Sequence, residues 1–301
     1  MTDNKLKLGV MGMSEGNGHP YSWGAIFNGY DEVYMKDCPF PVIPDYLSKQ
    51  EFPRDTIPNA QVTHIWTQSL NISAQIAKAA LIDNIVANPV DMIGEVDAVL
   101  LARDDHENHY AMSLPFLEAG IPVYIDKPLA VNVDEAKKIL SSEKYEGQVY
   151  SCSALRYARE FAPNQINIEQ LGKVRYVDAT IPKNWDKYSV HIIEPVLGLI
   201  PDRGRLLSVT NTGKGEVNIV TVRWENNVHA VFKVLGSVFC PFSIRLFGEK
   251  ESRELVFEDT FYAFKQALIA FVDSVRQKRI FIPRSETLEI IEIIERGFEQ
   301  Q

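Results

Sequence analysis

The feature that most constrains the fold is an alternation of short apolar runs with helical patterns over the first half of the chain. Strands separated by helices pair in parallel, so this half predicts a doubly wound α/β sheet. The runs expected to be strands are Lys5–Met11, Val62–Thr67, Ile85–Val86, Asp97–Ala102 and Pro122–Ile125. One helix is expected to begin near Pro20. Three more are expected over Ile72–Leu81, Asn108–Glu118 and Asp134–Leu140.

The second half has a different order of predicted elements, because several of its strand patterns follow one another without helices between them. Successive strands joined by turns indicate an open, mostly antiparallel sheet. These strand patterns are Val174–Thr180, Leu206–Thr212, Glu216–Trp224, Val228–Leu235 and Phe242–Phe247, and two helical patterns follow at Tyr262–Arg276 and Thr287–Arg296. The sequence therefore predicts a Rossmann-like α/β domain over residues 1–148 and an α+β domain over residues 149–301.

The composition narrows the class of protein. Hydrophobic residues make up 46% and charged residues 24% of the 301 positions, which is typical of a globular protein. The net charge is −9 and no basic block stands out, so we expect no nucleic-acid partner. No apolar run reaches the roughly 18 residues that cross a bilayer, and Met1–Lys7 does not resemble a signal peptide, so we expect no membrane association. The 3 scattered cysteines indicate reduced thiols and a cytoplasmic protein.

One segment of the first half, Tyr30–Gln61, contains five prolines and little periodicity. A long irregular segment inside a compact domain is often functional. Two readings stay open for it. It either covers an edge of the sheet, or it packs near a cofactor or the mouth of an active site.

A glycine-rich turn, Gly12–Gly18, follows the first strand. In doubly wound folds such a turn holds the pyrophosphate of a dinucleotide, with the spacing G-x-G-x-x-G. Only Gly12 fits that spacing, because Ser14 occupies the position of the second glycine. We expect Gly12, Met13 and Ser14 to contact the cofactor. The same residues match the G-x-S-x-G elbow of hydrolases. That reading is disfavoured because the elbow serine follows a later, central strand.

The next polar cluster lies before the helix at 108–118 and contains Asp104, Asp105, His106, Glu107 and His109. His106 and His109 are three residues apart and share a helix face in principle, as metal ligands do. Acidic residues are also favoured near helix N-termini, and no second ligand pair accompanies this one. We therefore predict no metal site.

The stretch Ala119–Pro128 ends an apolar strand with Asp126, Lys127 and Pro128, 18 residues after His109. It resembles the glucose–fructose oxidoreductase and inositol dehydrogenase family (Gfo/Idh/MocA), whose members have Glu-Lys-Pro at this point. Supporting similarities are Leu155–Tyr157, which resembles the arginine–aromatic stretch that opens the second domain, Ile244–Lys250, Pro283 and the final helix. Asp126 replaces the usual glutamate, so the chain resembles an atypical member.

The resemblance implies an NAD- or NADP-dependent oxidoreductase that acts on a CH–OH group of a sugar or sugar derivative. In this family the lysine handles the hydroxyl proton beside the nicotinamide, often next to a cis proline, and here that residue is Lys127. His191 takes the place of the family's relay histidine, while Lys187 stands where an aspartate is usual. The resemblance also implies cofactor contacts at Ala102, Arg103, Asp104, His109, Asp126 and Lys127, substrate contacts at Tyr157, Lys187 and His191, and a homo-oligomer, a dimer or tetramer.

Two features leave the choice of cofactor and of function open. The second strand ends in Thr67 and Gln68, without the carboxylate that binds the ribose of NAD or an arginine for NADP. We expect these two residues to hydrogen-bond the ribose without a charge. The alternatives are a nucleotide- or sugar-binding sensor that has lost hydride transfer, and an enzyme of non-redox chemistry. We expect Lys127 and His191 to act in one pocket in either enzyme.

Overall fold

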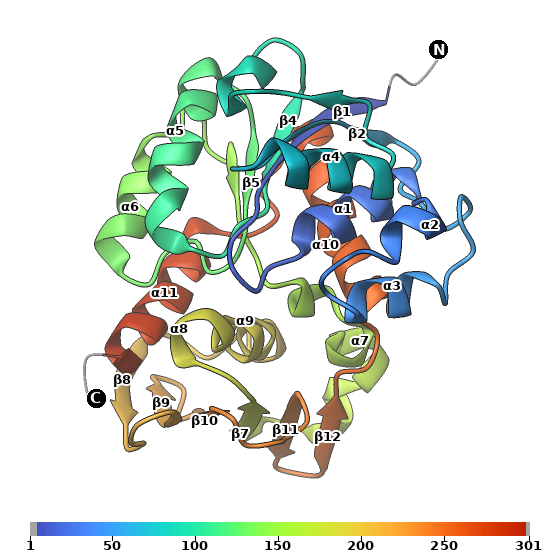
Figure 1. Cartoon of the computed structure of the whole chain (residues 1–301). Coiled ribbons are helices and arrows are strands. Elements are labelled where there is room, and N and C mark those ends of the chain that lie inside the picture. Colours follow the sequence, from blue (N-terminus) through green and yellow to red (C-terminus); the bar gives the residue numbers. More distant parts are fainter. Residues whose placement is uncertain (1–4, 299–301) are drawn as a thin grey trace. The chain divides into compact units, whose positions relative to one another are not determined.

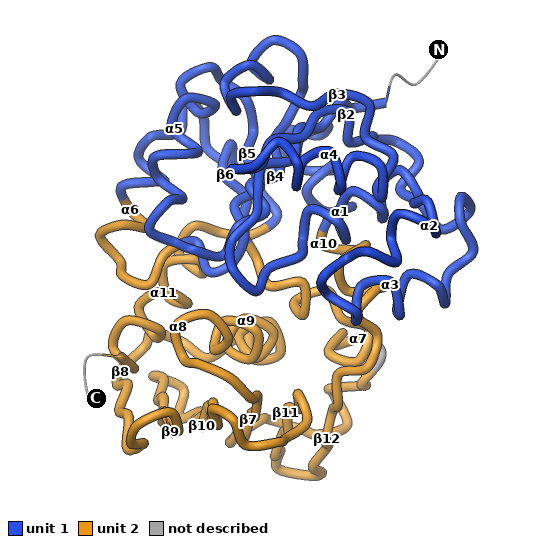
Figure 2. The backbone as a smooth tube through the Cα atoms, in the orientation of Figure 1, with its two compact units in different colours: residues 1–129, 138–151, 268–281 blue, residues 130–137, 152–267, 282–301 orange. Residues whose placement is uncertain are grey.

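The structure is a computed structural model that describes residues 5–298 (Figure 1). The chain forms two compact units, each assembled from separate stretches of sequence (Figure 2). Unit 1 comprises Met1–Leu129, Lys138–Ser151 and Leu268–Phe281, and unit 2 comprises Ala130–Lys137, Cys152–Ala267 and Ile282–Gln301. Within the described residues, no helix has both the length and the apolar character needed to span a bilayer.

Unit 1 is built on a six-stranded sheet whose neighbouring strands all pair in parallel. Its order is β3-β2-β1-β4-β5-β6, which confirms the predicted doubly wound sheet. The strands are β1 (Leu6–Met11), β2 (Ala60–Trp66), β3 (Asn84–Ile85), β4 (Ala98–Leu101), β5 (Val123–Ile125) and β6 (Val149–Tyr150). All of β4 is buried, because in such sheets both faces are covered by helices.

The helices of the first half follow the strand-to-strand connections expected for βαβ units. They are α1 (His19–Asn28), α2 (Glu32–Met35), α3 (Val42–Leu47), α4 (Leu70–Ala79), α5 (His109–Ala119) and α6 (Val133–Ser141), with the 3₁₀ turns η1 (Pro89–Met92) and η2 (His106–Asn108). Trp23 of α1 stacks on Tyr124 of β5, with ring centroids 5.0 Å apart. Tyr124 also packs on Phe271 of α10 (Thr260–Gln277), so aromatic rings fill this side of the core.

The proline-rich segment is more regular than its sequence predicts, because it forms α2 and α3. Asp31 accepts hydrogen bonds from the first turn of α2, which explains why so short a helix forms there. Phe40 and Ile43 reach the end of the glycine loop, where a Cβ on Gly18 would lie 2.4 and 2.6 Å from their side chains. Tyr46 hydrogen-bonds the hydroxyl of Ser22 in α1. The segment therefore packs beside the glycine loop.

Unit 2 contains a second six-stranded sheet, in the order β12-β11-β7-β10-β9-β8. Its strands are β7 (Val174–Ile181), β8 (Leu206–Asn211), β9 (Val217–Trp224), β10 (His229–Leu235), β11 (Ser243–Gly248) and β12 (Ser252–Val256). Among the strand pairs of this sheet within residues 5–298, β7 and β10 are parallel and the others are antiparallel. The predicted, mostly antiparallel sheet is therefore confirmed. The sequence analysis did not predict β12.

Helices pack on one face of this sheet, as Figure 1 shows for α9. The α-helices are α7 (Pro163–Ile166), α8 (Trp185–Tyr188), α9 (Val190–Leu199) and α11 (Arg284–Phe298), and the 3₁₀ turns are η3 (Ala154–Tyr157), η4 (Arg159–Phe161) and η5 (Ile168–Leu171). Burial alternates strictly along β10, where Ala230, Phe232 and Val234 are fully buried and the residues between them are half-exposed. The core of unit 2 thus lies between this face of the sheet and the helices.

Candidate active site

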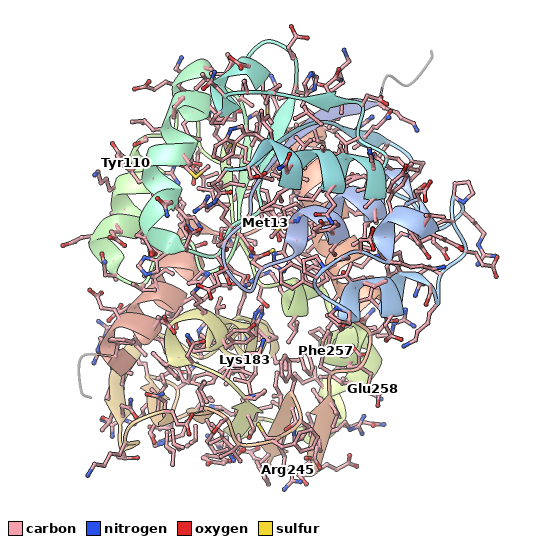
Figure 3. The ribbon with its side chains drawn as sticks, in the orientation of Figure 1. Met13, Tyr110, Lys183, Arg245, Phe257 and Glu258 are labelled. Atoms are coloured by element: carbon pink, nitrogen blue, oxygen red, sulfur yellow. The ribbon has the colours of Figure 1, made fainter. Side chains whose placement is uncertain are left out.

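The carboxyl ends of β1, β4 and β5 lie at one edge of the parallel sheet in unit 1. This edge is where open α/β sheets bind ligands. The loops that follow the three strands carry most of the cofactor residues predicted from the sequence: Gly12, Met13, Ser14, Ala102, Arg103, Asp104, Asp126 and Lys127. Met13 is labelled in the loop between β1 and α1 (Figure 3).

Hydrogen bonds connect these loops to one another. The hydroxyl of Ser14 donates to Asp104 Oδ1 at 2.7 Å and accepts the backbone N–H of Asp104 at 3.1 Å. Lys127 Nζ lies 3.8 Å from Asp104 Oδ2, and only 6% of Lys127 is exposed. The Lys127–Pro128 peptide bond is cis, as the resemblance implies. The candidate lysine is therefore nearly buried and lies beside a carboxylate.

Asp126 is the most enclosed charge of this edge, with 1% exposure. It accepts hydrogen bonds from Asn17 Nδ2 at 2.7 Å, and its Oδ2 lies 2.6 Å from His19 Nδ1. Burial would raise the pKa of this carboxyl, but His19 and Lys127 outweigh that effect and hold the pKa well below its usual range. Asn17 and His19 were not predicted as site residues. No local pattern signals them, because Asp126 lies 109 residues from Asn17 and 107 residues from His19 along the chain.

The histidine and acidic residues after β4 stabilise their own loop. His109 is fully buried, and its two ring nitrogens lie 3.0 Å from the carbonyl of Leu129 and 2.7 Å from that of Arg103. Burial lowers the pKa of His109, while the carbonyls of Leu129 and Arg103 oppose this effect, and the ring lies between the loop after β4 and the loop after β5. Arg103 forms a paired hydrogen bond with Asp105. Across residues 5–298, no group of three or more His, Cys, Asp or Glu side chains is arranged to hold a metal ion.

The glycine loop presents backbone N–H groups at the N-terminal end of α1. No acceptor within residues 5–298 takes the N–H of Glu15, Gly16 or Gly18. Such groups at a helix N-terminus suit an anion, because they carry positive partial charge. A Cβ on Gly12 would lie 2.6 Å from Pro20 and 2.8 Å from the carbonyl of Ala102, so only glycine lets β1, α1 and the end of β4 approach this closely.

The end of β2 differs from a usual ribose site. The Gln68 side chain accepts the backbone N–H of Met13 at 3.0 Å and donates to the Met13 carbonyl at 2.5 Å. These two hydrogen bonds join Gln68 to the glycine loop. The Thr67 hydroxyl is buried and donates to the carbonyl of Ser69. The backbone N–H groups of Glu15, Gly16 and Gly18 thus suit the pyrophosphate of a dinucleotide, and the amide of Gln68, which follows β2, is bonded to Met13.

Unit 2 holds the second polar network. His191, in the first turn of α9, has its Nδ1 2.7 Å from the hydroxyl of Ser153. Glu194, one turn further along α9, accepts the backbone N–H of Ser153 at 2.6 Å. Arg156 Nη1 contacts both Glu194, at 3.3 Å, and Glu286. Burial raises the pKa of Glu194 to about 7, although Arg156 opposes this effect. Ser153 was not predicted as a member of the site, whereas Glu194 stands where the resemblance implies a later aspartate.

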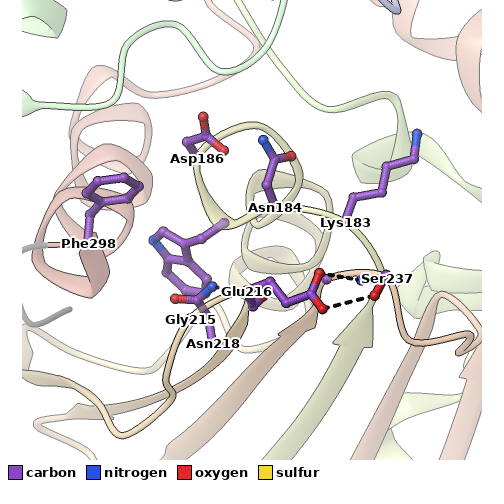
Figure 4. A pocket seen from close by; sticks show the side chains of 10 residues that line it. Lys183, Asn184, Asp186, Gly215, Glu216, Asn218, Ser237 and Phe298 are labelled. Carbon is purple, nitrogen blue, oxygen red and sulfur yellow. Dashed lines mark hydrogen bonds between the residues drawn. The ribbon is translucent and has the colours of Figure 1, made fainter.

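The remaining predicted residues of unit 2 lie close in sequence to this network. Tyr157 ends η3, and Lys187 lies in α8, next to Tyr188, whose ring is 5.5 Å from that of His191. A separate cavity of 540 Å³ is lined by the start of α8, by the β9 and β10 ends and by Phe298 (Figure 4). Glu216 and Ser237 are hydrogen-bonded to each other inside it. Neither His191 nor Lys187 lines this cavity.

Comparisons with known proteins agree with the Rossmann-like fold of unit 1. Residues 48–153 match the Gfo/Idh/MocA oxidoreductase family, described as having an NAD-binding Rossmann fold. Inositol 2-dehydrogenase 1 of Saccharopolyspora erythraea is 36% identical over 86 residues, which cover 28% of this chain and only 25% of that protein. The resemblance noted in the sequence is confirmed over this part of the chain, which is similar to the Gfo/Idh/MocA family.

Solved structures show the same fold over the whole chain. Apo scyllo-inositol dehydrogenase of Lactobacillus casei has a TM-score of 0.73 at 12% identity, covering 100% of this chain and 98% of that one. GenD2 of gentamicin A biosynthesis, in complex with NAD, has a TM-score of 0.74 at 11% identity, covering 99% and 94%. Identities this low show a common fold.

Proposed function

We propose that this protein is an NAD- or NADP-dependent oxidoreductase that oxidises a CH–OH group of a sugar or cyclic polyol. The observation that carries the proposal is the carboxyl edge of the parallel sheet, where Lys127 follows β5 and the glycine loop follows β1. Similar proteins support it, since one is named an inositol dehydrogenase and another binds NAD. The substrate class comes from these relatives.

In this proposal the bound nicotinamide supplies the hydride acceptor, and the side chains manage the proton. Lys127, in its neutral form, takes the proton of the reacting hydroxyl, and His191 hydrogen-bonds the substrate or acts in proton transfer. Asp104 and Asp126 hold the loop that carries Lys127. Glu15, Gly16 and Gly18 bind the pyrophosphate through their backbone.

A titration with NAD(H) and NADP(H), followed by nicotinamide fluorescence and thermal shift, tests the first half of the proposal. Saturable binding is expected, and turnover is then sought by absorbance at 340 nm with a panel of inositols and sugars. Lys127→Met serves as the control that retains binding and loses turnover. Binding of neither nucleotide contradicts the proposal.

One observation favours a second candidate, a sensor that binds a nucleotide or sugar without oxidising it. Gln68 makes both of its hydrogen bonds to Met13, where an enzyme of this fold usually presents a carboxylate to the ribose. Nucleotide binding without turnover of any substrate in the panel supports the sensor.

We also propose a homo-oligomer that associates through the outer face of the unit 2 sheet. Tyr176 and Phe247 pack together there at 5.6 Å, and Tyr176 is 36% exposed. Along β10 the half-exposed positions include Val231 and Leu235. Sedimentation equilibrium is expected to show a dimer or tetramer, and a monomer at micromolar concentration would contradict the proposal.

A further inference from the structure

The contact between Ser153 and His191 allows the protons to be assigned. Ser153 is fully buried, and its hydroxyl oxygen makes two hydrogen bonds: one to the backbone N–H of Leu155 at 3.1 Å and one to His191 Nδ1 at 2.7 Å. The backbone N–H of Leu155 is a donor only. The hydroxyl proton of Ser153 therefore has one acceptor within residues 5–298, which is His191 Nδ1.

The opposite assignment is unfavourable. If His191 Nδ1 carried the proton and donated to Ser153, the serine oxygen would receive two donors and its own proton would be buried without an acceptor. A buried polar hydrogen without a partner costs free energy, and such groups are rare in folded proteins. The Ser153 contact thus selects one of the two neutral forms of the ring.

We propose that Ser153 is a positioning residue that holds neutral His191 in the Nε2–H form, so that the imidazole presents a hydrogen-bond donor, not a base, to its ligand. This inference rests on the proposed function for the identity of the ligand, an oxygen of the substrate. It divides the work between the two candidate residues. In it His191 acts on the substrate by donation, and the transfer of the hydroxyl proton is left to Lys127, the other candidate residue.

The surroundings of His191 keep the serine in this geometry. Ser153 is the N-cap of η3, so its hydroxyl oxygen is fixed by Leu155, and its own backbone N–H is fixed by Glu194. The charged and titratable groups of the packed elements are Lys187 and Tyr188 of α8, Arg156 and Tyr157 of η3, Glu194 of α9 and Glu286 of α11.

The test is the ¹⁵N NMR spectrum of the histidine rings in the full chain, recorded at pH 8.5, where an ordinary histidine is neutral. His191→Gln identifies the signals of His191. In the parent we expect protonated Nε2 and unprotonated Nδ1. In Ser153→Ala we expect the two nitrogens to shift toward each other as both tautomers become populated, and Ser153→Thr, which keeps the hydroxyl, is expected to restore the parent pattern. A parent spectrum with protonated Nδ1 overturns the inference.

Turnover provides an independent measurement. Ser153→Ala is expected to lower kcat about tenfold with little change in KM, less than the ~10²–10⁴-fold typical of removing an acid–base group, and Ser153→Thr is expected to recover it. The spectrum reports the tautomer even if no substrate is turned over, so failure of the proposed oxidoreductase and failure of this inference are distinguishable. An unchanged spectrum in Ser153→Ala, in a variant that unfolds like the parent, also overturns the inference.

Discussion

The two polar networks hold their candidate residues in different ways. In unit 1, Lys127 is a cation among carboxylates, with Asp104 at 3.8 Å and Asp126 next to it in sequence. In unit 2, His191 contacts a neutral hydroxyl at 2.7 Å, and Glu194 accepts the backbone N–H of that serine. The first network depends on the balance of charge, and the second depends on the direction of a hydrogen bond.

This difference matches the chemistry that each residue is proposed to perform. A proton acceptor must change its charge during the reaction, so its neighbours must tolerate both states. A hydrogen-bond donor acts without changing charge and requires only a fixed orientation. Changes in unit 1 are therefore expected to alter the rate strongly, and changes in unit 2 to act through geometry and pH.

The largest expected effect follows from removing the Lys127 amine. Lys127→Met keeps most of the side-chain volume but leaves no group to take the hydroxyl proton, so kcat is expected to fall by about 10²–10⁴-fold. Nucleotide affinity, measured by fluorescence titration, is expected to remain near that of the parent. His191→Ala is expected to lower the rate less. Turnover of Lys127→Met at the parent rate would remove Lys127 from the reaction.

Much of unit 1 could be predicted from the sequence because strand, turn and helix follow one another locally. The helix predicted near Pro20 begins at His19, and the one predicted to end before Gly120 ends at Ala119. Gly120 adopts a positive φ of 80° there, which glycine tolerates. The two helices in the proline-rich segment were missed, because helices of four and six residues are too short to show a period.

The site was predicted only where its residues follow a strand or begin a helix. Asp126 and Lys127 were predicted from their resemblance to the family's Glu-Lys-Pro stretch at the end of a strand. His19 and Asn17 were missed, because their partner Asp126 lies 107 and 109 residues away and no local pattern encodes such a contact. Ser153 was missed for a similar reason, since its contact with His191 spans 38 residues.

The second prediction concerns pH and Glu194. Its pKa is raised from 4.5 to about 7 in the folded chain, so the folded state binds an extra proton between these values. The free energy of unfolding should therefore fall as the pH rises from 4.5 to 7, by about 3 kcal/mol at most. Urea unfolding at a series of pH values measures this slope.

Glu194→Gln removes the titrating group and is expected to flatten that part of the profile relative to the parent. Glu286→Gln is the matched control, since Glu286 contacts the same arginine from a more exposed position. Equal slopes in the parent and in Glu194→Gln would show that burial does not perturb this carboxyl.

The third prediction tests the close approach at Gly12. Gly12→Val introduces a side chain whose Cβ would lie 2.6 Å from Pro20 and 2.8 Å from the carbonyl of Ala102. Overpacking of this kind costs about 1–3 kcal/mol, and displacement of the loop should weaken nucleotide binding as well. Gly198→Ala in α9 is the control, because nothing lies within 4 Å of its Cβ, and it is expected to be neutral or slightly stabilising. A Gly12→Val variant with parental stability and affinity contradicts the role of the loop.

The smallest expected effect concerns the substrate and Lys187, which stands in α8 beside the His191 network. A lysine at this point favours a substrate with an anionic group, because its charge acts on binding and not on the reacting atoms. Lys187→Met should therefore raise KM about tenfold for a carboxylated or phosphorylated sugar while kcat stays near the parent value. For a neutral polyol the same variant should leave KM unchanged, which serves as the internal control. If the variant lowers kcat equally for both substrates, Lys187 belongs to the reaction chemistry, and unit 2 does more than orient the substrate.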